Sequence, residues 1–285
     1  MQAHWLEING IVLRVIIAGP SDGIPLVFLH GFPETAELSW RHQLGWFALK
    51  GYRVIAIDQR GYNLSDKPRQ VVDYRLEILA KDVVGVIGVL GYEQTIIIGH
   101  DWGAAVTWHL ADHHPNVVRR AIILNAPHGV VFKRTLLRNP RQWLRSWYIL
   151  FFQLPWVPER LLAWNSYARL RKVLCASTRQ GTFSDADLAH YVEVWRQPNA
   201  LHSMINWYRA IARYPVEQDP TRKIMVPVLM LWGEKDRFLL RDMAEPSIKM
   251  CKEGRLICLP EASHWLQHEA PDKVNRLIHD FVKMG

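Results

Sequence analysis

The sequence predicts an α/β protein with a mostly parallel central sheet that is covered by helices on both faces. Three observations carry this prediction. Short β-branched runs recur along the chain, helical patterns lie between some of them, and the alternation stops for one long stretch in the middle. Strands that alternate with helices favour a parallel sheet, which binds its ligands at the carboxyl ends of the strands.

Seven short runs are expected to be strands, several of them apolar on both faces. They are residues 12–17, 25–30, 53–58, 95–100, 121–125, 227–232 and 255–260. Between them, apolar residues from Ile78 to Leu90 follow helical spacing and stop at Gly91, and a second helical pattern over 104–114 stops at Pro115.

The middle of the chain breaks this alternation. From about Pro127 to Tyr214 the sequence is rich in Trp, Leu and Arg, has few β-branched runs and contains a helix start at Ser184. The strand pattern then resumes. We therefore expect residues 127–214 to form a helical cap that is inserted into a core domain of residues 1–126 and 215–285.

Composition is that of an ordinary globular protein, with 285 residues of which 49% are hydrophobic and 22% charged. The start of the chain shows no secretory signal, and no stretch approaches the roughly 20 apolar residues of a membrane span. Three cysteines without a CxxC pair suit a reducing compartment. We expect a cytoplasmic monomer or homodimer without stable membrane insertion.

The net charge of +8 is unevenly distributed. Between Arg119 and Lys172, eleven Lys or Arg residues stand against one acid, Glu159. We interpret the segment as a solvated basic face on surface helices, with an anionic substrate, a nucleic acid or a membrane surface as the alternative. No nucleic-acid module accompanies the charge, so no nucleic-acid partner is expected.

A strand, a tight turn and a helix meet at Asp101. The strand pattern runs into the sequence GHDWG at residues 99–103, and a helical pattern follows. This is the setting of the G-x-S-x-G nucleophile elbow, with Asp in place of Ser. A carboxylate that attacks an sp³ carbon leaves an ester that water can cleave, whereas a serine would leave an ether. Capping of the following helix is the alternative role for Asp101.

Two polar side chains follow later strands at the same edge of the sheet. Asp236 comes just after 227–232, and His264 just after 255–260. Nucleophile, acid and histidine therefore occur in the chain order of α/β-hydrolase triads. His264 would activate the hydrolytic water, and Asp236 would hold its tautomer, with Glu234 as a substitute acid.

Backbone groups are expected to complete the site. The segment HGFPE at residues 30–34 also follows a strand. The N–H groups of Phe32 and Trp102 would form the oxyanion hole for ester hydrolysis. No metal or cofactor is expected, because the histidine pairs at 109/113 and 264/268 lack the Glu of H-E-x-x-H.

These blocks resemble the epoxide hydrolase branch of the α/β-hydrolases over nearly the whole chain. The resemblance rests on HGFPE (30–34), DQRGY (58–62), GHDWG (99–103), Asp236 and His264. Haloalkane and fluoroacetate dehalogenases share the same blocks. The resemblance thus implies the α/β-hydrolase fold and an ester mechanism, and it indicates the mechanism class better than the substrate.

The central insertion distinguishes the epoxide hydrolases from the dehalogenases. Epoxide hydrolases carry two tyrosines there, which bind the epoxide oxygen and donate a proton. The segments YILFFQLP (148–155) and NWYR (206–209) resemble those blocks, so the resemblance implies these roles for Tyr148 and Tyr208. A neutral phenol suits the task, because ring opening releases a very basic alkoxide, whereas a halide needs no proton.

Two absences count against the dehalogenases. Haloalkane dehalogenases often have Asn where this chain has Phe32, and fluoroacetate dehalogenases place arginines at the positions of Trp102 and Ala105. The resemblance therefore implies an epoxide hydrolase whose substrate and water meet among Phe32, Trp102 and the two tyrosines. A haloalkane dehalogenase is the alternative.

Three large apolar residues of the insertion, Trp147, Phe151 and Trp156, have two interpretations. They suggest a hydrophobic substrate, but packing within the insertion is the simpler explanation.

Overall fold

One eight-stranded sheet runs through the computed structural model, which describes residues 1–217 and 219–284. The strand order is β1-β2-β4-β3-β5-β6-β7-β8. β2 runs antiparallel to both its neighbours, and all pairs from β4 to β8 are parallel. The strands are β1 Gln2–Ile8, β2 Ile11–Ala18, β3 Pro25–Leu29, β4 Arg53–Ile57, β5 Thr95–His100, β6 Val118–Leu124, β7 Val228–Gly233 and β8 Gly254–Leu259.

The expected mostly parallel sheet is confirmed, and each of the seven expected strands is present. The eighth strand, β1, has no counterpart among them. It lies at the edge of the sheet, and only Ile8 of its seven residues is buried. An edge strand that buries so few residues has no continuous apolar run, so the sequence pattern did not predict it.

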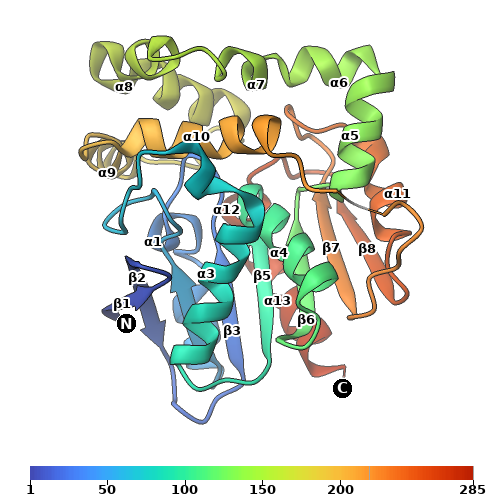
Figure 1. Cartoon of the computed structure of the whole chain (residues 1–285). Coiled ribbons are helices and arrows are strands. Elements are labelled where there is room, and N and C mark those ends of the chain that lie inside the picture. Colours follow the sequence, from blue (N-terminus) through green and yellow to red (C-terminus); the bar gives the residue numbers. More distant parts are fainter. Residues whose placement is uncertain (218, 285) are drawn as a thin grey trace.

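Helices cover both faces of the sheet (Figure 1). One buried cluster joins the sheet to α3 and α4, and a second cluster joins its other face to α2 and α13. These flanking helices are α1 Ala36–Ser39, α2 Leu44–Leu49, α3 Leu76–Val89, α4 Trp102–His113, α11 Ala244–Ile248, α12 Leu266–Glu269 and α13 Pro271–Lys283, with short 3-10 turns at η1 Val71–Tyr74 and η2 Arg241–Met243.

Between β6 and β7 the described residues form helices and no strands. Figure 1 shows α6 to α8 along the top of the molecule and α5 descending from them on the right, with α10 between the top layer and the sheet. Their bounds are α5 Gly129–Arg138, α6 Pro140–Arg145, α7 Trp147–Phe151, α8 Val157–Ser177, α9 Asp185–Trp195 and α10 Ala200–Arg213. The helix start at Ser184 is confirmed, because Ser184 and Asp187 cap α9 reciprocally.

Two indole groups tie this helical layer to the loops at the carboxyl ends of the strands. Trp195 of α9 donates a hydrogen bond to the carbonyl of Pro33 at 2.8 Å, and Trp207 of α10 donates one to the carbonyl of Arg60 at 3.0 Å. Both indoles are buried. The helices are therefore fixed directly above the edge at which ligands of a parallel sheet bind.

The expectation that Trp147 and Trp156 pack inside the insertion is wrong. Their exposed fractions are 58% and 73%, respectively. Helix α7 has only five residues, and it turns Tyr148 and Phe151 toward the core while Trp147 faces outward. None of the helices in the described chain has the length and apolar character that a bilayer crossing requires.

Helix α4 lies against β3 so closely that residue 103 must lack a side chain. A Cβ atom at Gly103 would overlap the carbonyl group of Leu29, which belongs to the backbone and cannot move aside. Gly88 of α3 is the opposite case, since it is exposed and a Cβ atom there would have no neighbour within 4 Å.

We predict that Gly103→Ala lowers the free energy of unfolding by about 1–3 kcal/mol or more, because the added methyl group must displace backbone. Gly88→Ala is the matched control and should raise it by about 0.5–1 kcal/mol, since alanine loses less entropy than glycine in a helix. Urea denaturation followed by circular dichroism measures both changes. Equal stability of the two variants would contradict the close packing of α4 on β3.

Candidate functional site

Asp101 occupies a strained turn between β5 and α4. Its backbone has φ 51° and ψ −117°, a region that residues with a side chain rarely adopt. Close packing requires the flanking glycines, because a Cβ atom at Gly99 would overlap the carbonyl of Gly103. The Asp101 side chain makes no capping bond to α4. Instead, its Oδ1 accepts a hydrogen bond from the Phe32 amide at 2.9 Å.

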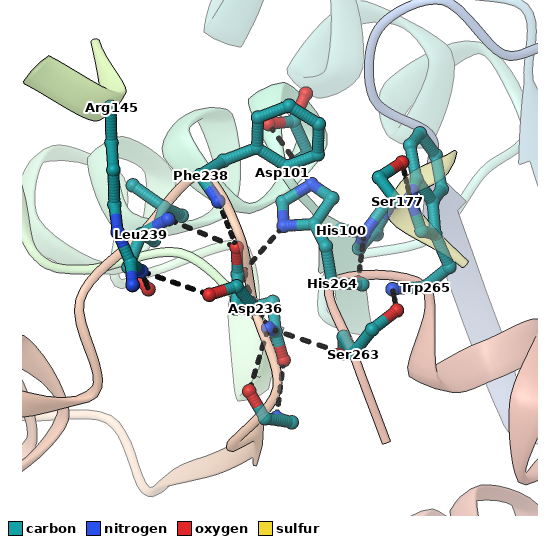
Figure 2. A network of polar contacts seen from close by, with 12 residues as sticks. His100, Asp101, Arg145, Ser177, Asp236, Phe238, Leu239, Ser263, His264 and Trp265 are labelled. Carbon is teal, nitrogen blue, oxygen red and sulfur yellow. Dashed lines mark hydrogen bonds and ion pairs between the residues drawn. The ribbon is translucent and has the colours of Figure 1, made fainter. Parts of the chain in front are cut away.

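The imidazole of His264 lies between two carboxylates (Figure 2). Its Nδ1 is 2.7 Å from Oδ2 of Asp236, and its Nε2 is 3.5 Å from Oδ2 of Asp101. The first distance is a strong charge-assisted hydrogen bond, whereas the second is longer than an ordinary one. His264 and Asp236 are buried, while 22% of the Asp101 side chain is exposed. The structure thus brings together the three residues expected from strand ends.

Asp236 is held by donors on both of its oxygens. Oδ1 accepts hydrogen bonds from the amides of Phe238 and Leu239 at 2.7 and 2.9 Å. Oδ2 accepts one from Nδ2 of Asn125 at 2.6 Å, beside its bond to His264. These donors compensate the loss of hydration on burial, so the carboxylate keeps a fixed position against the imidazole.

The two carboxylates raise the pKa of His264. Burial alone would lower it, but the charge of Asp236 and the contact with Asp101 outweigh burial and raise the pKa of His264 to about 10. In turn, burial disfavours the ionised form of Asp101, yet the contact with His264 and its charge hold the Asp101 pKa below its ordinary value. The resting pair is therefore a carboxylate and an imidazolium.

Glu234, the alternative acid, does not contact the histidine. Its carboxylate is exposed and lies 3.5 Å from Nε of Arg241. Asp236 is the acid that reaches His264.

The two expected oxyanion donors lie at the start of α4 and after β3. The Phe32 amide already contacts Asp101. Trp102 is the first residue of α4, so its N–H group has no carbonyl partner within the helix. The Phe32 amide therefore lies at Oδ1 of Asp101, whereas His264 lies at Oδ2, and the Trp102 amide follows Asp101 directly in the chain.

The rings of Tyr148 of α7 and Tyr208 of α10 lie beside each other, close enough to Asp101 for its charge to act on both. Their ring centres are 5.8 Å apart, and the Tyr208 ring packs edge-on against those of Trp102 and Phe32 at 5.0 and 5.4 Å. Burial, reinforced by the charge of Asp101, raises the pKa of both phenols above the ordinary value. Each phenol thus stays neutral over the usual pH range.

Three further side chains, which are not among the residues expected from the sequence, also shape this site. Asn125 stands at the end of β6 and bonds Asp236, and the guanidinium of Arg145 donates to the Asp236 carbonyl at 2.9 Å. Phe238 packs on the His264 ring with centres 5.1 Å apart. A search for polar residues at every strand end would have found Asn125, whereas no local pattern points to Arg145 or Phe238.

A buried carboxylate, Glu34, is linked to the backbone of His264 through His100. It contacts His268 at 2.7 Å, the hydroxyl of Tyr191 at 2.9 Å and Nδ1 of His100 at 3.3 Å. Burial opposes its ionisation, but the charge of His268 and bonds from both histidines hold the Glu34 pKa well below its usual range. His100 in turn contacts the carbonyl of His264 at 2.9 Å.

Comparison with known proteins agrees with this geometry. Residues 24–271 match the family described as alpha/beta hydrolase fold. The AB hydrolase superfamily protein YfhM of Bacillus subtilis is 44% identical over 99% of this chain and 98% of its own length. Epoxide hydrolase 4 of Homo sapiens is 39% identical over 96% of this chain and 76% of its own length.

Solved structures give the same result. The crystal structure of Bacillus megaterium epoxide hydrolase in complex with an inhibitor superposes with a TM-score of 0.89 at 31% identity, covering 98% of this chain and 99% of that one. The resemblance seen in the sequence is therefore confirmed, and the chain belongs to the α/β-hydrolase fold family, in the branch that contains these epoxide hydrolases.

Proposed function

We propose that this protein hydrolyses an epoxide to a vicinal diol through a covalent ester on Asp101. One observation carries the proposal: two neutral buried phenols face an ionised carboxylate that is backed by the His264–Asp236 pair. Opening of an epoxide requires a nucleophile that attacks a ring carbon and a proton donor at the ring oxygen. Asp101 would supply the first, and the two phenols the second. Relatives and structural neighbours named as epoxide hydrolases support the same substrate class.

In the first step, Oδ2 of Asp101 attacks a ring carbon of the epoxide, and the bond from that carbon to the ring oxygen breaks. Oδ2 is the oxygen available for attack, because Oδ1 is bonded to the Phe32 amide. Tyr148 or Tyr208 gives its proton to the departing oxygen, and the second phenol donates a hydrogen bond to it. The product is a hydroxyalkyl ester on Asp101.

Ester formation changes the acidity of His264. The ester carries no charge, so one of the two carboxylates that raise the His264 pKa is lost. The imidazolium then releases its proton, which replaces the one given by the tyrosine. His264 becomes the neutral base that the second step needs.

In the second step, His264 takes a proton from water, and the resulting hydroxide attacks the ester carbonyl carbon. Negative charge develops on Oδ1, where the Phe32 and Trp102 amides stabilise it. The intermediate collapses by breaking the bond between Oδ2 and the carbonyl carbon, and His264 protonates the departing diol oxygen. Asp236 stabilises the imidazolium throughout.

We further propose that residues 127–214 act as a cap over a core of residues 1–126 and 215–285. The cap supplies both tyrosines, and the indole bonds of Trp195 and Trp207 hold it over the strand ends. The aromatic side chains of Phe32, Trp102 and Phe238 around the carboxylate favour an apolar substrate. Three free cysteines suit the reducing cytoplasm as its place of action.

We predict that His264→Gln protein, mixed with an aryl or alkyl epoxide, accumulates an ester on Asp101, because the base for its hydrolysis is missing. Mass spectrometry of the intact protein and of the peptide containing Asp101 would detect the added mass. His264→Gln/Asp101→Asn protein is the control and should gain none. Diol formation by the parent protein without any adduct in His264→Gln protein would contradict the ester mechanism.

Tyr148→Phe/Tyr208→Phe is expected to lower kcat for epoxide opening by a factor of about 10²–10⁴ or more, because both proton donors are gone. Tyr167→Phe is the matched control, since the Tyr167 hydroxyl bonds the Trp195 carbonyl away from Asp101. Diol production measures the effect. Unchanged turnover in the double variant would contradict the role of the phenols, and turnover of a bromoalkane but of no epoxide would indicate a haloalkane dehalogenase.

Asp101→Asn is expected to lower the pKa of His264 from about 10, because it removes one negative neighbour without changing the shape of the site. The imidazolium should consequently lose its proton at a lower pH than in the parent protein. The ¹³Cε1 and ¹⁵N chemical shifts of His264 report this titration. A pKa that does not fall would contradict the proposed conversion of His264 into a base on ester formation.

A further inference from the structure

The outer layer of helices exposes an unusual amount of apolar surface. Of the twenty large hydrophobic residues that are exposed in the described chain, ten lie between residues 137 and 173. The most exposed of them have exposed fractions of 58–77% and are Leu137, Leu144, Trp147, Leu150, Trp156 and Trp164. Single exposed apolar residues are common, but clustering over neighbouring helices marks an interaction surface.

The same helices expose eight Lys or Arg side chains, at positions 133, 134, 138, 141, 160, 169, 171 and 172. None of the eight has a carboxylate within ion-pair distance in the part of the chain that the structure describes. We call these cations and the exposed apolar side chains of residues 137–173 the outer face.

No acid offsets this charge from within the segment. Glu159 is the only acidic residue between positions 127 and 184. Its carboxylate points inward, where it contacts Nη1 of Arg209 at 2.8 Å and Nδ1 of His202 at 3.1 Å. The outer face is therefore both apolar and strongly cationic.

We propose that the outer face docks on an anionic lipid bilayer. Tryptophan and leucine side chains enter the boundary between headgroups and acyl chains, while the surrounding cations meet the lipid phosphates. A second copy of the chain fits less well, because two such faces would bring sixteen like charges together. A nucleic acid could stack its bases on the four exposed tryptophans, but it would leave the six exposed leucines and valines in water, whereas a bilayer accepts both kinds of side chain.

The docking is peripheral. The indole rings stand on helices that pack on the rest of the protein, and no helix of the described chain could cross a bilayer. The proposal does not depend on the reaction at Asp101, so vesicle binding tests it without any substrate.

The experiment is sedimentation of the full chain with vesicles of phosphatidylglycerol and phosphatidylcholine, compared with vesicles of phosphatidylcholine alone. We expect apparent affinity to be at least about tenfold higher for the anionic vesicles, and to fall as salt screens the cations. Trp143→Ser/Trp156→Ser/Trp164→Ser should weaken binding at least about tenfold by removing the apolar part, with the cations intact.

The charge variant is Arg138→Glu/Arg141→Glu, also expected to weaken binding at least about tenfold. Its matched control is Lys273→Glu/Arg276→Glu on α13, which changes the net charge by the same amount at exposed positions away from the outer face. The control protein also carries Trp5→Ser, which removes an exposed tryptophan of β1. The control should bind within about twofold of the parent protein. Thermal unfolding of every variant shows that each is folded before binding is compared.

Four results would overturn the proposal. Folded parent protein that does not sediment with anionic vesicles excludes a docking face, and equal weakening in the control shows attraction through net charge alone. Tighter retention by DNA than by vesicles, or dimerisation in the absence of lipid that the tryptophan variant abolishes, would assign the face to another partner.

Discussion

The buried hydrogen bond between His264 and Asp236 is the interaction on which the rest of the site depends. An ionised carboxylate in a protein interior persists only when donors replace the water it has lost. Here those donors come from the loop after β7 and from Asn125 at the end of β6. Ends of adjacent strands therefore set the position of the acid, and the acid sets the tautomer and orientation of the histidine.

The nucleophile is held by a different kind of constraint. Asp101 has no freedom to leave its turn, because backbone contacts at Gly99 and Gly103 lock β5, α4 and β3 together. The strain of its left-handed backbone is thus supported by close packing on both sides. Above it, the tyrosines are fixed through Trp195 and Trp207, whose indoles bond the loops after β3 and β4. Nucleophile and proton donors share one rigid frame, which limits the reorganisation that a reaction would require.

The sequence predicted the parts of this frame that follow from local pattern. Apolar runs located the strands from β2 to β8, and two glycines around Asp101 located the turn. Asp236 and His264 could be paired because parallel strands end at one edge. Arg145 could not be assigned, because its bond to the Asp236 carbonyl joins segments that lie 91 residues apart.

The sequence pattern also could not predict which tryptophans of the insertion face the solvent. A run such as WYILF is apolar at every position, so periodicity does not tell which side chains face the core. Only the packing of α7 on its neighbours decides that Trp147 points outward and Tyr148 inward.

Helix α7 therefore has two sides with different surroundings. With five residues it is little more than one turn, so its outer and inner side chains share one short piece of backbone. The exposed Trp147 is the chain neighbour of Tyr148, whose ring lies beside that of Tyr208. Surface and candidate site are accordingly only one residue apart at this point of the chain.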